Sequence, residues 1–441
     1  MHYDYSTVLD RRNIGSVKWD EMAAYGVTGE GIVPLSNAEM EFANAPEITE
    51  GLQEFVGKRV LSYFQPTPDY FEAVKGWFCR RHGFTLETKN ILPNHNIHVA
   101  SATVVAAFTE PGDGVIVMEP TWPGFFGAIE GQNREKVVTE LINRNGYYEI
   151  DFEDFEKKAA DPKNKMLFLC SPHNPVGRVW TRAELQRIVD ICCDNNVLII
   201  SDELHCDIVM PGYKHIPVAT LSERAAQNSI TFVGCSKAFN IAGLDISNVI
   251  IYNEELSQRY RKERASRGMT RPNMLGVAAT QIALERGEAW LEGAVEVIAK
   301  NAAYVEQFVA EKMPLITCTH LEATYLMWLD LRKLGLDIHV MEQSLMRDAQ
   351  LFMDDGFYFG AGGEGFERMN VAVPHQVIID AMERLYQWYK KQITVIRRIY
   401  PFHRQFQRFS AANSAHGRRC GKDPLSLHGC RGKESIFFYR V

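Results

Sequence analysis

The sequence predicts a doubly wound α/β fold joined to a smaller α+β unit. From about residue 90 to 285, short apolar runs alternate with amphipathic stretches of helical period. The runs cover residues 115–118, 166–170, 197–200, 230–233 and 249–252, and their uniform apolar character is typical of strands covered on both faces. Between two of them, Thr181 and Glu184 form a capping box ahead of apolar residues at helical spacing. Strands alternating with helices indicate a parallel sheet.

The smaller unit is predicted from a change in pattern after Trp290. A long helix at 295–311 precedes a strand-like stretch at 324–330, and a second helix is expected at 339–348. Another strand at 367–373 and a closing helix at 375–391 complete the series. Helices and strands in this mixture indicate an α+β architecture.

Length and composition limit the class of protein. With 441 residues, 46% of them hydrophobic, the chain exceeds one ordinary domain. A net charge of -7 gives no reason to expect a nucleic acid or an anionic membrane as partner. The N-terminus lacks a secretory signal, and no apolar run approaches about 20 residues. These two observations lead us to expect a cytoplasmic location. The nine cysteines show no paired zinc spacing, so we expect reduced thiols and no metal site.

The C-terminal segment 393–441 differs from the rest of the chain. It holds ten Lys or Arg against two Asp or Glu and has no sustained period. Two interpretations remain open: a functional basic tail, or a segment without selected structure. Scattered aromatic and apolar residues such as those at 436–439 favour the second, and we expect disorder.

Three polar residues follow successive predicted strands: Asn174, Asp202 and Lys237. Parallel α/β sheets bind ligands at the carboxyl ends of their strands, so these side chains are expected in one crevice. A lysine, with a carboxylate for a pyridinium nitrogen, is what pyridoxal phosphate (PLP) requires. Taken singly, Asp202 could be a helix N-cap, Lys237 a solvated surface group and Asn174 a turn residue. As an ordered trio they reinforce one another.

With these residues in place, the chain resembles the fold-type I PLP enzymes of the aspartate aminotransferase superfamily. Within that superfamily it is most similar to the MalY/PatB family of carbon–sulfur β-lyases, over residues 5–392. His205, where many aminotransferases have tyrosine, and His-Ile-Pro at 215–217 favour the lyase branch. The motifs that carry the resemblance are NPVGR at 174–178, SDELH at 201–205, SKAFN at 236–240, RPN at 271–273 and TYLMWLD at 324–330.

The resemblance implies an architecture. A large PLP-binding domain at 49–288 would hold a mostly parallel seven-stranded sheet, and a small domain would span 289–392. Residues 1–48 would pack with the small domain, and 393–441 would form the tail.

The resemblance also implies roles for individual residues. Lys237 would bind the cofactor covalently and act as the base at the substrate Cα. Asp202 would pair with the pyridine nitrogen, and Asn174 would donate to the ring oxygen. Trp122 would stack on the ring, unless it is an ordinary core residue. Arg368 would clamp the substrate carboxylate. The remaining expected cofactor contacts are His205 and Ser236, and substrate contacts are also expected from Asn174 and Trp122.

The phosphate would lie at the start of a helix, on Asn96 and Ile97. Tyr63 would reach the phosphate of a neighbouring subunit, which implies a homodimer. Several positions depart from the family pattern. The chain has Ala-Glu-Met-Glu-Phe at 38–42 in place of Ala-Asp-Met-Asp-Phe, and an altered phosphate loop at 93–97. It also has Gly234 where a phosphate-binding serine is common, and Asp245 would repel a phosphate.

The expected function is PLP-dependent β-elimination of cystathionine or another cysteine S-conjugate, an amino-acid substrate, giving a thiol, pyruvate and ammonia. An aminotransferase requires the same proton abstraction and remains an alternative. A PLP-binding regulatory protein with degraded catalysis is the third possibility, because the departures concentrate around the phosphate.

Overall fold

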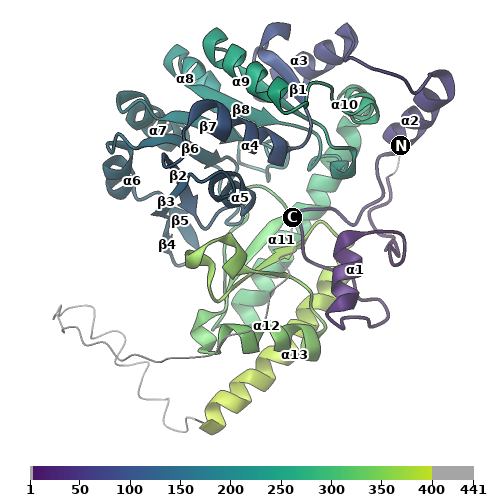
Figure 1. Ribbon diagram of the computed structural model, residues 1–441. Coiled ribbons are helices and arrows are strands. Elements are labelled where there is room, and N and C mark those ends of the chain that lie inside the picture. The colour runs from purple at the N-terminus through teal and green to yellow at the C-terminus, as the bar shows by residue number, and fades with distance from the viewer. Residues whose placement is uncertain (1–2, 400–441) are drawn as a thin grey trace, which may run out of the picture.

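The computed structural model describes residues 3–399, with side chains described as far as residue 395. Its centre is a seven-stranded sheet in the order β1-β9-β8-β7-β6-β2-β3 (Figure 1). Strand β9 runs antiparallel to both neighbours, and the other pairings are parallel. The strands are β1 Ile91–Asn94, β2 Gly114–Glu119, β3 Glu135–Glu140, β6 Asn164–Cys170, β7 Leu198–Asp202, β8 Ser229–Val233 and β9 Ser247–Ile251.

All five strands expected from the apolar runs are present, each within two residues of its predicted bounds. Side chains alternate between the two faces: in β2, Val115 and Val117 join one hydrophobic cluster, while Ile116 and Met118 join another. Helices cover both faces, which confirms the doubly wound arrangement. One face carries α4 Ile97–Phe108, α5 Gly124–Glu130 and α9 Glu254–Ser266; the other carries α6 Phe152–Ala159, α7 Arg182–Asp194 and α8 Glu223–Gln227.

The capping box at the start of α7 forms as predicted. The Thr181 side chain accepts a hydrogen bond from the Glu184 amide, and the Glu184 carboxylate accepts one from the Thr181 amide. These bonds satisfy donors that a helix start otherwise leaves unpaired.

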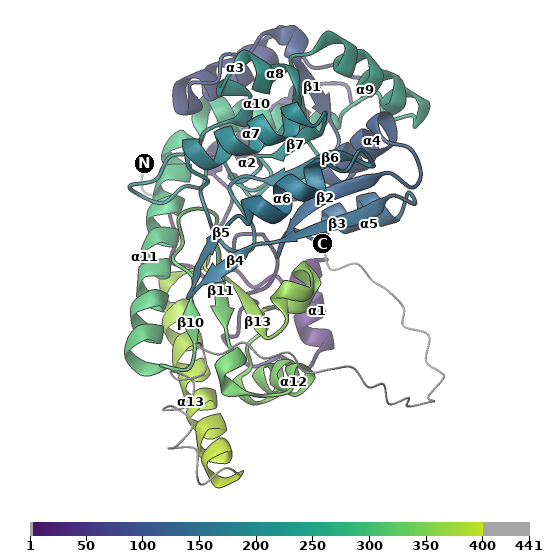
Figure 2. The ribbon, with the colours of Figure 1, turned by 90° about the vertical axis from the view of Figure 1, so that its left-hand side faces the viewer.

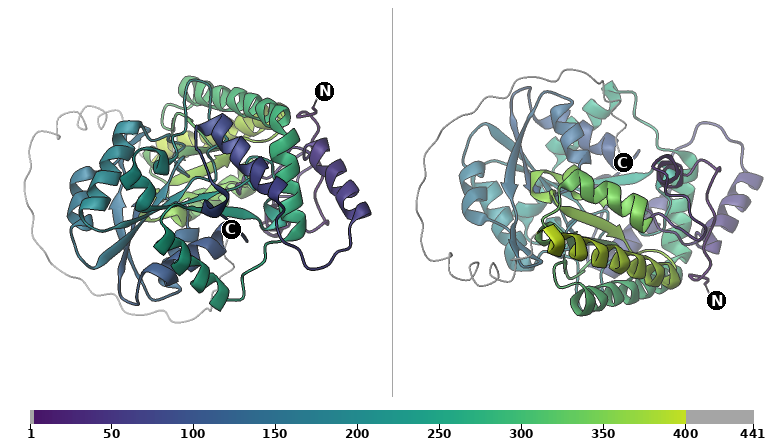
Figure 3. Two further views of the ribbon diagram at one scale, coloured as in Figure 1. Left: turned by 90° about the horizontal axis from the view of Figure 1, so that it is seen from above. Right: turned by 90° about the horizontal axis from the view of Figure 1, so that it is seen from below.

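A second, four-stranded antiparallel sheet has the order β10-β11-β13-β12. Helices α12 and α13 lie side by side against it, and α11 runs from this unit to the flank of the large sheet (Figures 2 and 3). The elements are α11 Glu288–Lys312, β10 Thr317–Cys318, β11 Leu326–Asp330, α12 Ile338–Ala349, β12 Asp354–Asp355, β13 Phe366–Asn370 and α13 His375–Ile399. Helix α13 continues eight residues beyond its predicted end, so the helical part of the chain extends into the segment expected to be an irregular tail. Residues 400–441 of that segment lie outside the described residues.

The N-terminal segment packs on the smaller sheet. The Leu35 amide donates to the Phe352 carbonyl, the Asn370 amide donates to the Leu35 carbonyl, and the Glu41 amide donates to the Ala372 carbonyl. Helices α2, α3 and α10 form a separate group beside the large sheet. The remaining elements are α1 Val17–Ala24, α2 Pro46–Lys58, α3 Pro68–His82, α10 Met274–Arg286, the hairpin of β4 Ile142–Arg144 and β5 Tyr147–Glu149, and six short 3-10 turns. Within residues 3–399, no helix has the length and apolar character needed to cross a membrane.

Candidate active site

A cavity opens at the carboxyl ends of β6, β7 and β8, where the sequence places Asn174, Asp202 and Lys237. Nine of the ten predicted site residues line it, contributed by both sheets. They are Asn96, Ile97, Trp122, Asn174, Asp202, His205, Ser236, Lys237 and Arg368.

Lys237 lies in the segment that leaves β8. Its Nζ donates a hydrogen bond to the Ala38 carbonyl at 3.1 Å, so the N-terminal segment holds the amine in place. Burial, followed by the positive charge of Arg368, lowers the pKa of Lys237 to about 8. A substantial fraction of this amine is therefore neutral near pH 8, as a nucleophile or general base requires.

Asp202 is the last residue of β7, and its side chain is buried on the cavity wall. A turn follows it, so the helix N-cap interpretation is wrong. Its Oδ1 accepts one hydrogen bond, from the Leu204 amide at 3.2 Å. Burial raises the pKa of Asp202 to about 7, because the Leu204 amide and the charge of Lys237 offset only part of the effect of losing water. A cationic donor in the cavity would stabilise the ionised carboxylate.

Arg368 is buried in β13, and three of its bonds orient it. Its Nε and Nη2 donate to Asp354 Oδ2 at 3.0 and 2.7 Å, and its Nη1 donates to Asn174 Oδ1 at 2.9 Å. Asp354 stands opposite Arg368 in the β12–β13 register. Because the Asn174 Oδ1 accepts a hydrogen bond from Arg368, the group that Asn174 can offer to a ligand is its Nδ2 donor.

His205 and Trp122 supply rings to the cavity wall. His205 is buried, and its Nδ1 has no hydrogen-bond partner in the part of the chain that the structure describes. Burial lowers the pKa of His205 to about 3, with smaller contributions from Lys237 and Arg368, so the ring is neutral at pH 7. The Trp122 ring lies 4.8 Å from that of His98 and 5.2 Å from that of Phe125, between centroids. Trp122 thus packs against both rings and also lines the cavity.

The N-terminus of α4 also lines the cavity. Asn96 is the N-cap: its Oδ1 accepts from the Val99 amide at 3.0 Å, and its Nδ2 donates to Asp245 Oδ1 at 2.9 Å. Free amides at a helix start favour an anion, whereas the Asp245 carboxylate opposes one. The predicted phosphate loop is shorter than expected, since residues 93 and 94 belong to the edge strand β1. A Cβ atom added at Gly234 would make only ordinary van der Waals contacts, the nearest at 3.4 Å. The backbone here therefore has space for the serine that is common at this position.

Tyr63 does not reach the cavity of its own chain. It lies between α2 and α3 with 89% of its surface exposed, and the Arg271 guanidinium lies 4.6 Å from its ring centre. Val60 and Leu61 beside it are also exposed.

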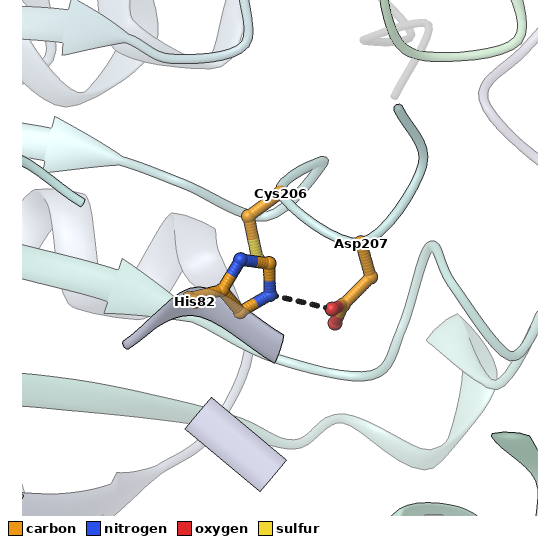
Figure 4. Close-up of side chains that lie close together, drawn as sticks. All are labelled: His82, Cys206 and Asp207. Atoms are coloured by element: carbon orange, nitrogen blue, oxygen red, sulfur yellow. Dashed lines mark hydrogen bonds and ion pairs between the residues drawn. The ribbon is translucent and has the colours of Figure 1, made fainter. Parts of the chain in front are cut away.

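Three potential metal ligands, which do not line the cavity, lie close together: His82, Cys206 and Asp207 (Figure 4). His82 Nε2 is 2.7 Å from Asp207 Oδ1, and the Trp77 indole donates to both oxygens of the same carboxylate. Burial raises the pKa of Asp207, but the hydrogen bond and charge of His82 and the nearby Arg81 outweigh it and lower the pKa overall. Burial raises the pKa of the Cys206 thiol, which disfavours the thiolate that binds metals. The carboxylate is thus already satisfied by protein groups, and the seven described cysteines are free thiols.

Several wall residues escaped the sequence analysis. They include Asn37, Ala38, His98, Asp354, Tyr358 and Phe359. Asp354 belongs to a two-residue strand, too short for a periodic signal. The Ala38 carbonyl is a backbone group, and residue type gives no indication of its role. The departure from the family pattern at 38–42 is accommodated by neighbouring side chains. Glu41 is buried; Lys18 Nζ lies 2.8 Å from its Oε1, and the Trp19 indole donates to its Oε2 at 3.0 Å.

Comparison with known proteins assigns the family. The aminotransferase class I and II family model matches residues 30–385. Cystathionine beta-lyase PatB of Bacillus subtilis is 34% identical, over 85% of this chain and 97% of its own. The protein MalY of Escherichia coli is 29% identical, over 84% and 95%. Cystalysin from Treponema denticola, a crystal structure that contains pyridoxal 5'-phosphate, is 42% identical with a TM-score of 0.87, covering 89% of this chain and all of its own.

The chain therefore belongs to the aminotransferase class I and II family. Its resemblance to the MalY and PatB proteins and its fold-type I architecture are both confirmed.

Proposed function

We propose that the chain is a PLP-dependent carbon–sulfur lyase that cleaves cystathionine or related cysteine S-conjugates. The observation that carries the proposal is the placement of the Lys237 amine, the Asp202 carboxylate and the Arg368 guanidinium around one cavity. Two relatives that match over almost their whole length favour this chemistry: PatB is named a cystathionine beta-lyase, and cystalysin contains pyridoxal 5'-phosphate.

The residues present fit PLP. Asp202 is a buried carboxylate that accepts a hydrogen bond from the Leu204 amide, and a protonated pyridine nitrogen would give it a charged hydrogen-bond donor. The Asn174 Nδ2 would donate to the ring oxygen, and the Arg368 contact with the Asn174 Oδ1 supports this orientation of the amide. His205 Nδ1 is a buried ring atom without a hydrogen-bond partner among residues 3–399. Trp122 would cover one ring face, while Ser236 and the amides of Ile97 and its neighbours would hold the phosphate.

PLP, when bound, accepts the electron pair left at the substrate Cα. Lys237 would hold the cofactor through its amine, and the same amine, when free, would take the proton from the substrate Cα. Arg368 holds the α-carboxylate, which orients the Cα–H bond toward Lys237. Loss of the sulfur substituent from Cβ as a thiol and addition of water yield pyruvate and ammonia.

We also propose a homodimer in which Tyr63 of one copy reaches the phosphate in the other. The exposed cluster of Val60, Leu61 and Tyr63 supports this arrangement, because apolar side chains seldom gather on a free surface without a partner. Sedimentation should show a dimer. Tyr63→Phe should weaken PLP binding, and the variant should still sediment as a dimer. The division into domains at 49–288 and 289–392 is part of the same proposal.

The decisive test is pyruvate release from L-cystathionine without an added keto acid. A lyase produces pyruvate under these conditions. An aminotransferase stops after one turnover and resumes when a keto acid is supplied. PLP binding with no turnover of any amino acid would instead support a degraded regulatory protein.

A further inference from the structure

A short piece of the N-terminal segment, residues 37–41, lies beside Lys237, and we call it the strap. Its residues Asn37 and Ala38 line the cavity. The Ala38 carbonyl accepts the hydrogen bond from Lys237 Nζ at 3.1 Å. The strap belongs to no helix or strand, so bonds to other parts of the chain must fix its position.

Asn240 ties the strap to the loop that carries Lys237. Its Oδ1 accepts a hydrogen bond from the Met40 amide at 2.9 Å, and its Nδ2 donates one to the Met40 carbonyl at 2.9 Å. One side chain thus satisfies both backbone groups of a strap residue. The backbone of Asn240 is left-handed, with φ at 56°, a conformation that asparagine tolerates and glycine adopts freely.

Asn370 ties the strap to β13, the strand that also carries Arg368, the proposed carboxylate clamp. Asn370 is buried, and its Nδ2 donates hydrogen bonds to the carbonyls of Asn37 and Glu39, both at 2.7 Å. These two carbonyls belong to the residues on either side of Ala38. Because both are held by Asn370, the Ala38 carbonyl between them is left to face the lysine amine.

We infer that the strap positions the Lys237 amine, and that Asn240 and Asn370 are the positioning residues that hold the strap in place. The inference rests on the proposed role of Lys237 and adds two residues to it. When the amine is free to take the Cα proton, the Ala38 carbonyl gives it a fixed acceptor, so the base is already oriented toward the substrate. Since Asn370 and Arg368 share a strand, the same strap connects the base with the carboxylate clamp.

The strap also affects the protonation of the amine. Burial, followed by the charge of Arg368, lowers the pKa of Lys237 to about 8, while the charges of Asp202 and Glu39 act in the opposite direction. The Ala38 carbonyl, as an acceptor, also favours the ammonium form. The other ionisable groups on the wall belong to parts of the chain outside the strap: His98, Cys170, His205, Asp245, Asp354 and Tyr358. Because the strap supplies both Glu39 and the Ala38 carbonyl, its displacement should lower the pKa of Lys237 further.

The protonation of Lys237 can be measured without the cofactor. Competitive acetylation of the apoprotein with acetic anhydride at a series of pH values, followed by mass spectrometry of the peptide that contains Lys237, gives the pH at which half of the amine is neutral. This midpoint should lie near pH 8 in the wild-type protein. In Asn240→Gly it should fall by about half a pH unit, as expected when an ammonium group loses one hydrogen bond. Asn370→Ala should lower the midpoint in the same direction, because it releases the strap from β13.

Asn196→Gly is the matched control for Asn240→Gly. Asn196 also has a left-handed backbone, with φ at 58°, but it is exposed between α7 and β7 and does not line the cavity. Its midpoint should equal that of the wild-type protein.

L-alanine tests the base apart from carbon–sulfur cleavage, because it has a Cα proton and no leaving group. Exchange of that proton on the PLP-loaded enzyme in deuterium oxide can be followed by NMR. Asn240→Gly should lower the exchange rate at saturating alanine several-fold, because the amine is no longer held in line with the Cα–H bond. The alanine concentration at half saturation should change little, since the partners of Arg368 are untouched.

An unshifted midpoint in both Asn240→Gly and Asn370→Ala would overturn the inference, and so would an equal shift in Asn196→Gly. An unchanged exchange rate at saturating alanine in Asn240→Gly would also contradict it. If the midpoint and the exchange rate fall as expected but no thioether yields pyruvate, the proposed carbon–sulfur cleavage is refuted and the role of the strap stands.

Discussion

Asp245→Asn should tighten PLP binding. The Asp245 carboxylate lies on the cavity wall at the start of α4, where the phosphate is proposed to bind, and it accepts from the Asn96 side chain at 2.9 Å. Asparagine can accept the same bond, and it tolerates the left-handed backbone found here, with φ at 48°. The substitution therefore removes a charge with little other change.

The magnitude follows from Coulomb's law. A unit charge about 7 Å from a doubly charged phosphate, screened as in water, is repelled by about 1 kcal/mol. Removal of the repulsion should lower the PLP dissociation constant several-fold. The gain should shrink in high salt, because screening already weakens the repulsion in the wild-type protein.

Equilibrium dialysis of the apoproteins against PLP measures the effect. Asp337→Asn, which removes the N-cap carboxylate of the distant helix α12, is the control for a general change in net charge. Equal affinities for wild type and Asp245→Asn, at low and high salt, would show that Asp245 does not face the phosphate.

Four further predictions concern the same site and the C-terminus. Lys237→Ala should abolish turnover, and borohydride reduction of the native enzyme should label the peptide that contains Lys237; a label on any other lysine contradicts the assignment. Attachment of PLP to the apoprotein should speed up as pH rises, with a midpoint near pH 8, because the neutral amine reacts and the pKa of Lys237 is lowered to about 8; a midpoint near 10 in stopped-flow absorbance would refute this. Asp202→Asn should reduce kcat by orders of magnitude yet stabilise the apoprotein at pH 8. Because the pKa of Asp202 in the folded protein, about 7, lies above the ordinary value, the free energy of unfolding of the wild-type protein falls as the pH rises from about 4 to 7. In urea unfolding the variant should therefore be more stable than the wild type by up to about 4 kcal/mol above pH 7, and equally stable near pH 3. Truncation after Ile399, the end of α13, should preserve activity and PLP content; aggregation of the truncated protein would assign a role to the segment beyond it.

The large sheet was predictable because its strands are buried on both faces and therefore appear as uninterrupted apolar runs. Strand β1 was missed for the opposite reason. It is an edge strand that contains Pro93 and ends at Asn94, two residues that argue against a central strand. The extension of α13 was missed because its basic residues were attributed to the tail, although charged residues are ordinary on an exposed helix face.

The residues of the candidate site also fall into those that the sequence could predict and those that it could not. Asp202 and Lys237 were found because residues at the ends of parallel strands converge whatever lies between them. Asp354 was not, since its meeting with Arg368 depends on the register of two short antiparallel strands. Tyr63 could be assigned only through the family resemblance, because within one chain it lies on the surface.

Asp245 and Asp354 place negative charge at two positions on the wall of one cavity, and their effects should be separable. The first lies beside the proposed phosphate position and the second on the carboxylate clamp. Asp245→Asn should therefore change PLP affinity, while Asp354→Asn should weaken binding of the amino-acid substrate, because Asp354 holds the Arg368 guanidinium. If each carboxylate acts mainly on its own neighbour, the double variant should show the sum of the two free-energy changes. A clear departure from additivity would mean instead that the cavity responds to its total charge, and that phosphate binding and substrate binding are coupled.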